Sequence, residues 1–475
     1  MAKSAHFKNL SVNALQLIVN QLFGLSIFYI LSTGLSKDSF GQLNLALAIL
    51  LSVFNILSCG IDQLIIKKIA ADEDRKSALS LYIIHTLVTG LLFYGLLLIG
   101  FVLFGHGSGV YVLLLLIGIG KLMIYFSTPY KQAATGLELF KLLAWLSIIS
   151  NFVRCACLII FLLLHQLDLS IIVAIFIAGD VLEFVIGLIL FKRKAKLRVS
   201  LKWDKRNYLS LLREALPQMG VVLITSSLAR FDWIFIGFLL SAVKLAEYSF
   251  AYKIFEMAAL PLTAIAPLLI PRFTKMFKQG DVDTDKLRFL IRMEIIIAAF
   301  TVLLLNIYWA PIIDWLTHGK YGAVNRNTIF ILSLCLPLLY MENFLWTIFF
   351  AQGRLKMILQ AFMLTIAVNV LGDVVLIPIY KNEGAAIAFL LACMAQIIFY
   401  LSKNTLPQLR KIWQPLIICT ACAVASGCAA KIILEGWVMI PVSVFFYAAL
   451  LLLTGQIRLR YKRQLLTLAN SSVHT

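Results

Sequence analysis

The sequence predicts an all-α integral membrane protein with about fourteen transmembrane helices, and three observations lead to this fold class. Of the 475 residues 61% are hydrophobic, and the mean hydropathy is +0.93. Soluble domains contain about 45–50% apolar residues, so this chain has more apolar side chains than a water-soluble core could bury. Apolar runs long enough to cross the roughly 30 Å hydrocarbon layer recur along the chain. The basic residues gather on one side of these runs.

Fourteen apolar runs have the length of a membrane span. The first is too long for the core of a signal peptide and lacks an A-x-A cleavage site, so we expect it to remain as a span. The runs lie at about 10–33, 42–62, 78–104, 110–128, 143–165, 170–191, 215–240, 246–270, 289–310, 327–350, 357–378, 384–402, 412–433 and 437–455.

The lysines and arginines give the topology. Of the 42, 32 lie in or beside alternate connections, six in or beside the other connections, and four deep inside spans. The first group includes KRKAKLR at 192–198 and RLRYKR at 458–463. Because short basic connections stay cytoplasmic, we expect both termini in the cytoplasm. This dispersed pattern accounts for the net charge of +19, and no nucleic-acid partner is expected.

The longest connection, 192–214, separates the sixth and seventh spans. The sequence WDKRNYLSLLREALP at 203–217 mixes basic and apolar residues at helical spacing. Such a segment predicts an interfacial helix on the inner leaflet, linking two halves of the protein.

A weak internal repeat relates these halves. LSKDSFGQLNLALAI at 35–49 aligns without gaps with LSAVKLAEYSFAYKI at 240–254, and SIISNFVRCACLII at 147–160 aligns with TIAVNVLGDVVLIP at 365–378. Each pair enters the membrane in the same direction, so the repeat is parallel. Chance similarity between apolar helices is the alternative. A parallel repeat is typical of a two-lobed transporter with its cavity between the lobes.

Ten ionisable residues fall well inside spans. A charge at the bilayer centre costs about 2.5–3.5 kcal/mol on insertion scales, so these groups must face one another or a watery cavity. They are Lys121, Arg154, Asp180, Glu183, Arg230, Asp232, Lys253, Glu256, Glu342 and Asp373.

Spacing suggests which of these charges pair. Residues three apart share a helix face, so Lys253 can pair with Glu256. Arg154 lies at the depth of the two acids in the next span and can pair with one of them. Arg230 and Asp232 are two apart and their side chains diverge, which favours an open cavity. Either these charges are ion pairs that hold helices together, or they line a polar cavity for an anionic cargo, because guanidinium groups bind phosphates.

Signatures of catalysis are missing from the sequence. GIGKL at 118–122 lacks the spacing and the hydroxyl residue of a P-loop, and no protease or hydrolase motif occurs. Cys419 and Cys422 form a CxxC in an apolar span without a histidine, which favours buried packing over a metal site. We therefore expect no catalytic residue, no metal and no cofactor.

Three stretches resemble the Wzx-like polysaccharide flippase family, a branch of the superfamily that also holds the lipid II flippases and the multidrug MATE exporters. They are NVLGDVVLIPIYKNEGAAIAF at 369–389, the stretch at 216–254 that contains Leu216, Pro217, Asp232 and Tyr248, and GIDQLIIKKIA at 60–70. The motifs are mostly small residues that let helices pack closely. The first two spans lack arginine and the first lacks any charge, unlike the two sister groups.

This resemblance implies two pseudo-symmetric six-helix lobes plus two C-terminal helices. The lobes would be 1–191 (helices 1–6) and 215–403 (helices 7–12), joined by the basic linker 192–214. Residues 404–475 would hold helices 13–14 and a basic cytoplasmic tail. A protein of this family would move an undecaprenyl-diphosphate-linked oligosaccharide across the bacterial inner membrane by alternating access, for surface polysaccharide or O-antigen synthesis. Polysaccharide polymerase and glycosyltransferases would be its partners.

On this reading four cations would give the substrate cavity its positive potential: Arg154, Arg230, Lys253 and Lys121. Six acids would act as counter-charges or couple transport to a proton or cation: Asp232, Asp180, Glu183, Glu256, Glu342 and Asp373. Two rival functions stay open, a cation-coupled exporter of small molecules and a membrane enzyme of glycan assembly.

Overall fold

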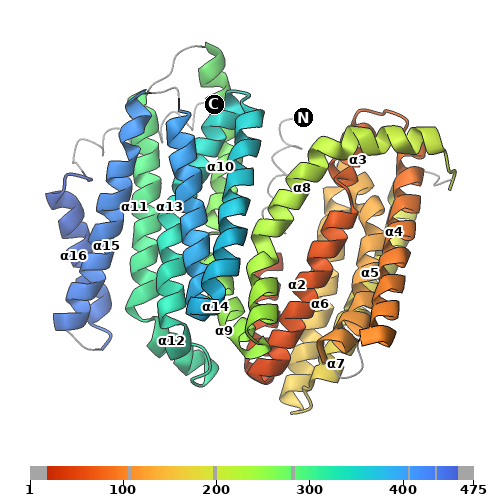
Figure 1. Cartoon of the computed structure of the whole chain (residues 1–475), viewed down its shortest axis with the longest axis horizontal. Coiled ribbons are helices and arrows are strands. Elements are labelled where there is room, and N and C mark those ends of the chain that lie inside the picture. The colour runs from red at the N-terminus through yellow and green to blue at the C-terminus, as the bar shows by residue number, and fades with distance from the viewer. Residues whose placement is uncertain are drawn as a thin grey trace. The chain divides into compact units, whose positions relative to one another are not determined.

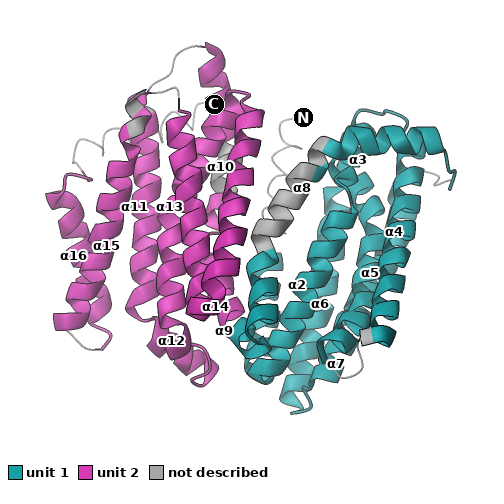
Figure 2. Cartoon of the chain, in the orientation of Figure 1, with its two compact units in different colours: residues 1–246 teal, residues 247–475 magenta. Residues whose placement is uncertain are grey.

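The computed structural model describes residues 19–104, 109–195, 201–279, 284–404, 407–433 and 436–457. All regular secondary structure in these ranges is helical (Figure 1). The chain divides into two compact units, Met1–Ala246 and Glu247–Thr475 (Figure 2).

Unit 1 holds the helices of the first seven predicted spans. Residues 19–34 are helical, and the start of the first predicted span lies outside the described residues. The helices that follow are α2 Lys37–Leu57, α3 Ile61–Ala70, α4 Arg75–Phe104, α5 Gly109–Gly136, α6 Phe140–Leu163, α7 Leu169–Lys194 and α8 Lys205–Leu239.

The predicted span at 42–62 is divided between two of these helices. α2 begins earlier than predicted, because the Ser36 hydroxyl accepts a hydrogen bond from the Ser39 N–H at 3.1 Å and caps the helix. α2 ends before Cys59 and Gly60, which adopt positive φ angles of 52° and 72°. Left-handed residues of this kind end helices, so α3 starts as a separate element.

Unit 2 contains the remaining predicted spans. α9 Ala242–Ala258 crosses the boundary between the units. The helices after it are α10 Pro261–Gln279, α11 Thr284–Ile307, α12 Trp309–Thr317, η1 Ala323–Asn325, α13 Arg326–Ala351, α14 Leu355–Ser402, η2 Pro407–Ile412, α15 Trp413–Ile433 and α16 Met439–Leu453.

Two predicted boundaries in this half differ from the structure. The span at 246–270 is broken by a turn before Pro261, which starts α10, the helix position that proline favours. α14 contains two predicted spans, 357–378 and 384–402, and Lys381 interrupts it with φ 54° and ψ −129°.

The chain is a multi-pass integral membrane protein. Among the described residues nine helices are long and apolar enough to cross a membrane, and α14, with its two predicted spans, counts once among them. Many of the large side chains on these helices are exposed and apolar, for example Leu92, Leu96 and Val102 on α4. Such a surface is compatible with lipid and costly in water.

The predicted interfacial helix is the first part of α8. Asp204 caps this helix by accepting hydrogen bonds from the N–H groups of Arg206 and Asn207 at 2.9 and 3.3 Å. In Figure 1 this part runs across the ends of neighbouring helices before α8 turns along them. Leu211 and Ala215 are buried in an apolar cluster with α3 and α4, so the segment packs on the helix bundle.

Candidate functional site

Two of the cations predicted inside unit 1 converge on Asp180. This carboxylate lies on α7 and is 1% exposed. Lys121 on α5 donates to both of its oxygens, with Nζ at 2.9 and 3.2 Å. Arg154 on α6 donates to Oδ1 of the same group through Nη2. Three helices are thus joined by one buried acid, and the predicted pairing of Arg154 with an acid of the next span is confirmed.

A second acid lies one turn further along α7. Glu183 Oε1 is 2.5 Å from Nζ of Lys131, and its Oε2 is 3.7 Å from Nη2 of Arg154. Lys131 was not among the predicted site residues, because the predicted span ended at residue 128. The helix α5 runs through Pro129 to Gly136 and carries Lys131 to the acid. This five-residue group has three cations and two acids, a formal charge of +1.

Two glycines leave space for the charged side chains of this five-residue group. A Cβ built on Gly120 of α5 would lie 2.7 Å from Oδ2 of Asp180, and one built on Gly179 of α7 would meet the Arg154 side chain. Any larger residue would push these charged groups apart. Small residues that allow close approach are common where membrane helices pack.

Asparagines extend the group toward the first helix. Asn151 Oδ1 accepts a hydrogen bond from Arg154 Nη1 at 3.2 Å. Asn151 Nδ2 donates to Oδ1 of Asn20, in the helix at 19–34, at 3.2 Å. Asn369, which aligns with Asn151 in the predicted repeat, likewise binds a charged residue on the next turn, donating to Asp373 Oδ2 at 3.0 Å.

Lys121 also borders a small cavity. The cavity has a volume of about 90 Å³ and is lined by α2, α3 and α5, including Asp62 and Tyr125. Asp62 accepts a hydrogen bond from the Tyr82 hydroxyl, and Tyr125 shares a 2.9 Å hydrogen bond with Thr89. Lys121 therefore has both a buried counter-ion and a small cavity beside it.

Arg230 on α8 has a different environment from the other predicted cations. Its guanidinium carbon lies 4.1 Å from the centre of the Trp233 ring, a cation–π distance. Its Nη1 is buried without a hydrogen-bond partner among the described residues. Asp232 accepts a hydrogen bond from the Trp233 N–H at 2.8 Å. Within the described part of the chain, Arg230 thus has a buried donor without a partner.

The remaining predicted residues lie in unit 2. Lys253 Nζ is 2.7 Å from Glu256 Oε2, so that predicted pair is confirmed. Glu342 on α13 is 7% exposed, and its Oε1 has no hydrogen-bond partner among the described residues. Asp373 is fully buried on α14 beside Asn369.

Sequence reasoning missed two more buried acids among the described residues of this unit, and one of them is Glu247 on α9, which is 4% exposed. Glu294 lies inside the predicted span 289–310 on α11 and is 9% exposed, with Oε2 unpartnered in the described part of the chain. Its position in an apolar run was the signal that could have found it.

Comparison with known proteins identifies a family to which the sequence is similar and structures with a similar fold. The sequence pattern of a family described as polysaccharide biosynthesis protein matches residues 6–277. By sequence, no curated protein matches the chain.

Several solved structures share the architecture. The chain is similar to the lipid II flippase MurJ in an inward closed conformation, with a TM-score of 0.74 and 13% identity over 97% of this chain and 100% of that one. It is similar to an inward-facing multidrug resistance MATE family transporter of the MOP superfamily, with a TM-score of 0.64 and 14% identity over 85% of this chain and 98% of that one. A MOP superfamily transporter from Pyrococcus furiosus gives a TM-score of 0.53 and 15% identity, over 86% of this chain and 93% of that one. The chain therefore shares its fold with these proteins.

Proposed function

Because the chain belongs to the polysaccharide biosynthesis protein family, we propose that it translocates an undecaprenyl-diphosphate-linked oligosaccharide from the cytoplasmic to the outer leaflet of a bacterial inner membrane. The family match is the observation that carries this proposal. The fold agrees with it, since the similar MurJ structure is that of a lipid II flippase. The flipped product would feed a polysaccharide polymerase, and glycosyltransferases would supply the substrate.

Arg230 is the best candidate for direct contact with the diphosphate. Its guanidinium is held against the Trp233 ring and keeps a buried donor without a partner among the described residues. A planar guanidinium can bind phosphate oxygens through two parallel hydrogen bonds. Lys121 and Arg154 share Asp180, and Lys253 is paired with Glu256, so these three would act mainly through their potential.

The acids divide into two proposed roles. Asp180, Glu183 and Glu256 are counter-charges that hold cations in place inside the membrane. Glu342, Asp373 and Asp232 are buried and would couple transport to a proton or another cation. Alternating access would let the substrate reach these groups from either leaflet in turn.

Mass spectrometry of lipid-linked intermediates tests the function in cells. Deletion of the protein should cause an undecaprenyl-diphosphate oligosaccharide to accumulate and surface glycan to fall. Arg230→Ala should reproduce this accumulation, while Arg206→Ala, an exposed arginine on the same helix, should complement as well as wild type.

Other outcomes would point to the rival functions. Unchanged lipid-linked intermediates with accumulation of a cationic dye would indicate an exporter of small molecules. Lengthening of glycan chains by purified protein would indicate an enzyme of glycan assembly.

A further inference from the structure

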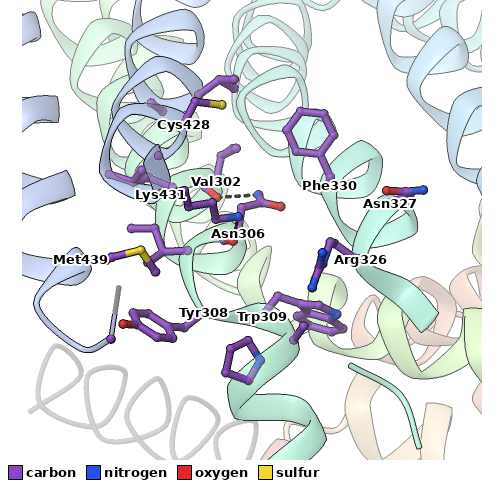
Figure 3. A pocket seen from close by; sticks show the side chains of 18 residues that line it. Val302, Asn306, Tyr308, Trp309, Arg326, Asn327, Phe330, Cys428, Lys431 and Met439 are labelled. Carbon is purple, nitrogen blue, oxygen red and sulfur yellow. Dashed lines mark hydrogen bonds between the residues drawn. The ribbon is translucent and has the colours of Figure 1, made fainter. Parts of the chain in front are cut away.

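A large pocket in unit 2 lies apart from all the charges discussed so far. It has a volume of about 670 Å³ and lies between α11, α12, α13, α15 and the start of α16 (Figure 3). Most of its lining is apolar, with Val302, Phe330 and Met439 among the wall residues. The pocket is large enough for part of a lipid or another small amphiphile.

The charged residues in the described lining of this pocket are all basic. Arg326 of α13 and Lys431 of α15 line it, and no described lining residue is acidic. Lys431 donates one hydrogen bond, from Nζ to the Asn306 carbonyl oxygen at 2.9 Å, which leaves two of its three donors. Arg326 is also the first residue of α13, and the dipole of this helix adds positive potential at its N-terminal end. Such a site favours an anion.

The predicted spans 289–310, 327–350, 412–433 and 437–455 end or begin beside this pocket, which places it near one surface of the membrane. Tyr308 stacks on Trp437 with ring centres 5.0 Å apart, and Trp309 Nε1 donates to the Gly322 carbonyl oxygen at 2.9 Å. Trp437 is 69% exposed, and exposed tryptophan gathers at the level of lipid headgroups. Ile432 and Ile433 follow the lining residue Lys431 in the chain and are exposed and apolar, a surface suited to acyl chains. By the charge pattern of the sequence, this end of the helices faces away from the cytoplasm.

We propose that this pocket binds an anionic phospholipid of the outer-facing leaflet. The phosphate would lie near Arg326 and Lys431, and an acyl chain would pack against Val302, Phe330 and Met439. Charge complementarity and headgroup depth identify the occupant. The proposal is independent of the substrate proposed above, because the pocket contains none of the residues assigned to transport.

Cys428 provides a reporter inside the pocket. It lines the pocket, and of the eight cysteines, all in described residues, it alone is exposed. The experiment measures the rate at which N-ethylmaleimide alkylates Cys428 in the purified full-length protein, followed by peptide mass spectrometry. Phosphatidylglycerol in mixed micelles should slow alkylation by about 10-fold relative to phosphatidylcholine, since lipid bound through charge-assisted hydrogen bonds covers the thiol.

Matched variants assign the effect to the two cations. Arg326→Gln with Lys431→Gln should abolish protection by phosphatidylglycerol, and the glutamine at position 431 can still donate to the Asn306 carbonyl. Lys320→Gln, at a neighbouring lysine that does not line the pocket, should leave protection unchanged. Each single variant should show partial protection, and thermal unfolding without lipid checks that the variants are folded.

Three results would overturn the proposal. Equal protection by phosphatidylcholine would indicate an apolar groove without headgroup selectivity. Equal protection by inorganic phosphate alone would indicate a small-anion site. Protection that persists in the folded double variant would show that the two cations do not bind the headgroup.

Discussion

Replacing Asp180 by asparagine tests the charge network most sharply. The carboxylate is 1% exposed and is hydrogen-bonded by Lys121 and Arg154. Asparagine keeps the shape and removes the negative charge, so the formal charge of the five-residue group rises from +1 to +2. Both cations then lie together in a membrane-spanning region without their shared counter-ion.

The expected cost follows from the burial of the group. Breaking a buried ion pair by removing one partner costs on the order of 3–5 kcal/mol. Lys121 is 13% exposed and borders the small cavity, where water can solvate part of its charge. We therefore expect Asp180→Asn to lower the free energy of unfolding by about 3 kcal/mol, the lower end of that range.

Unfolding by SDS in mixed micelles measures this free energy. The matched control is Asp168→Asn on the same helix, where the carboxylate caps α7 by accepting from the Ile171 N–H at 2.8 Å. Asparagine caps helices about as well as aspartate, so this control should change stability by less than about 0.5 kcal/mol. If the two variants unfold alike, the reasoning about Asp180 is wrong.

A triple variant separates stability from transport. Lys121→Met, Arg154→Met and Asp180→Leu together replace the ionic cluster with apolar side chains and leave Lys131 paired with Glu183. Replacing a buried ionic cluster in this way is often neutral or stabilising. We expect stability near wild type with transport lost, whereas full transport would show that these charges only hold helices together.

Further variants test the geometry around these groups. Gly120→Ala should lower the free energy of unfolding by about 1–3 kcal/mol, because the new Cβ would lie 2.7 Å from Asp180 Oδ2. The control is Gly187→Ala, whose Cβ would meet only side-chain carbons at 3.8 Å or more. This control should be nearly neutral in the same SDS titration. Arg230→Lys should reduce surface-glycan export even though it keeps the charge, since an ammonium group cannot bind phosphate bidentately; export equal to wild type would remove the guanidinium from the mechanism. Trp233→Ala should reduce export less than Arg230→Ala, because it removes the ring that orients the guanidinium and leaves the donor itself, and equal losses would contradict this order.

Helix positions could be read from the sequence because the bilayer leaves few alternatives. A segment inside lipid must satisfy its own backbone hydrogen bonds, so each long apolar run becomes a helix. The runs predicted at 143–165 and 412–433 correspond to α6 at Phe140–Leu163 and α15 at Trp413–Ile433. The predicted resemblance is likewise confirmed for the family and for the superfamily fold.

Breaks within spans were less predictable, although each has a local cause. Pro261 begins α10 and was a readable signal for the break in the span at 246–270. The span predicted at 110–128 ends just before Pro129, yet α5 continues through this proline and brings Lys131 into the network. Proline is tolerated inside membrane helices when neighbouring groups satisfy the freed carbonyl.

The pairing of charged residues on different helices could not be predicted fully from the sequence. Spacing predicted that Arg154 pairs with an acid at the same depth. That Lys121 shares the same carboxylate depends on α5 packing closely against α7 at Gly120, and a separation of 59 residues carries no such information. The position of a charged residue within its span gives its depth in the membrane, whereas the packing of the helices decides which residue it pairs with.

Flipping of a defined substrate in liposomes tests the central claim most directly. Purified protein would be reconstituted with a labelled undecaprenyl-diphosphate oligosaccharide, and the fraction of label exposed on the opposite leaflet would be followed over time. We predict that wild-type protein and Arg206→Ala speed this exposure, while Arg230→Ala in folded, reconstituted form does not. Exposure at the rate of protein-free liposomes with wild-type protein, under an imposed proton or sodium gradient and without one, would contradict the account.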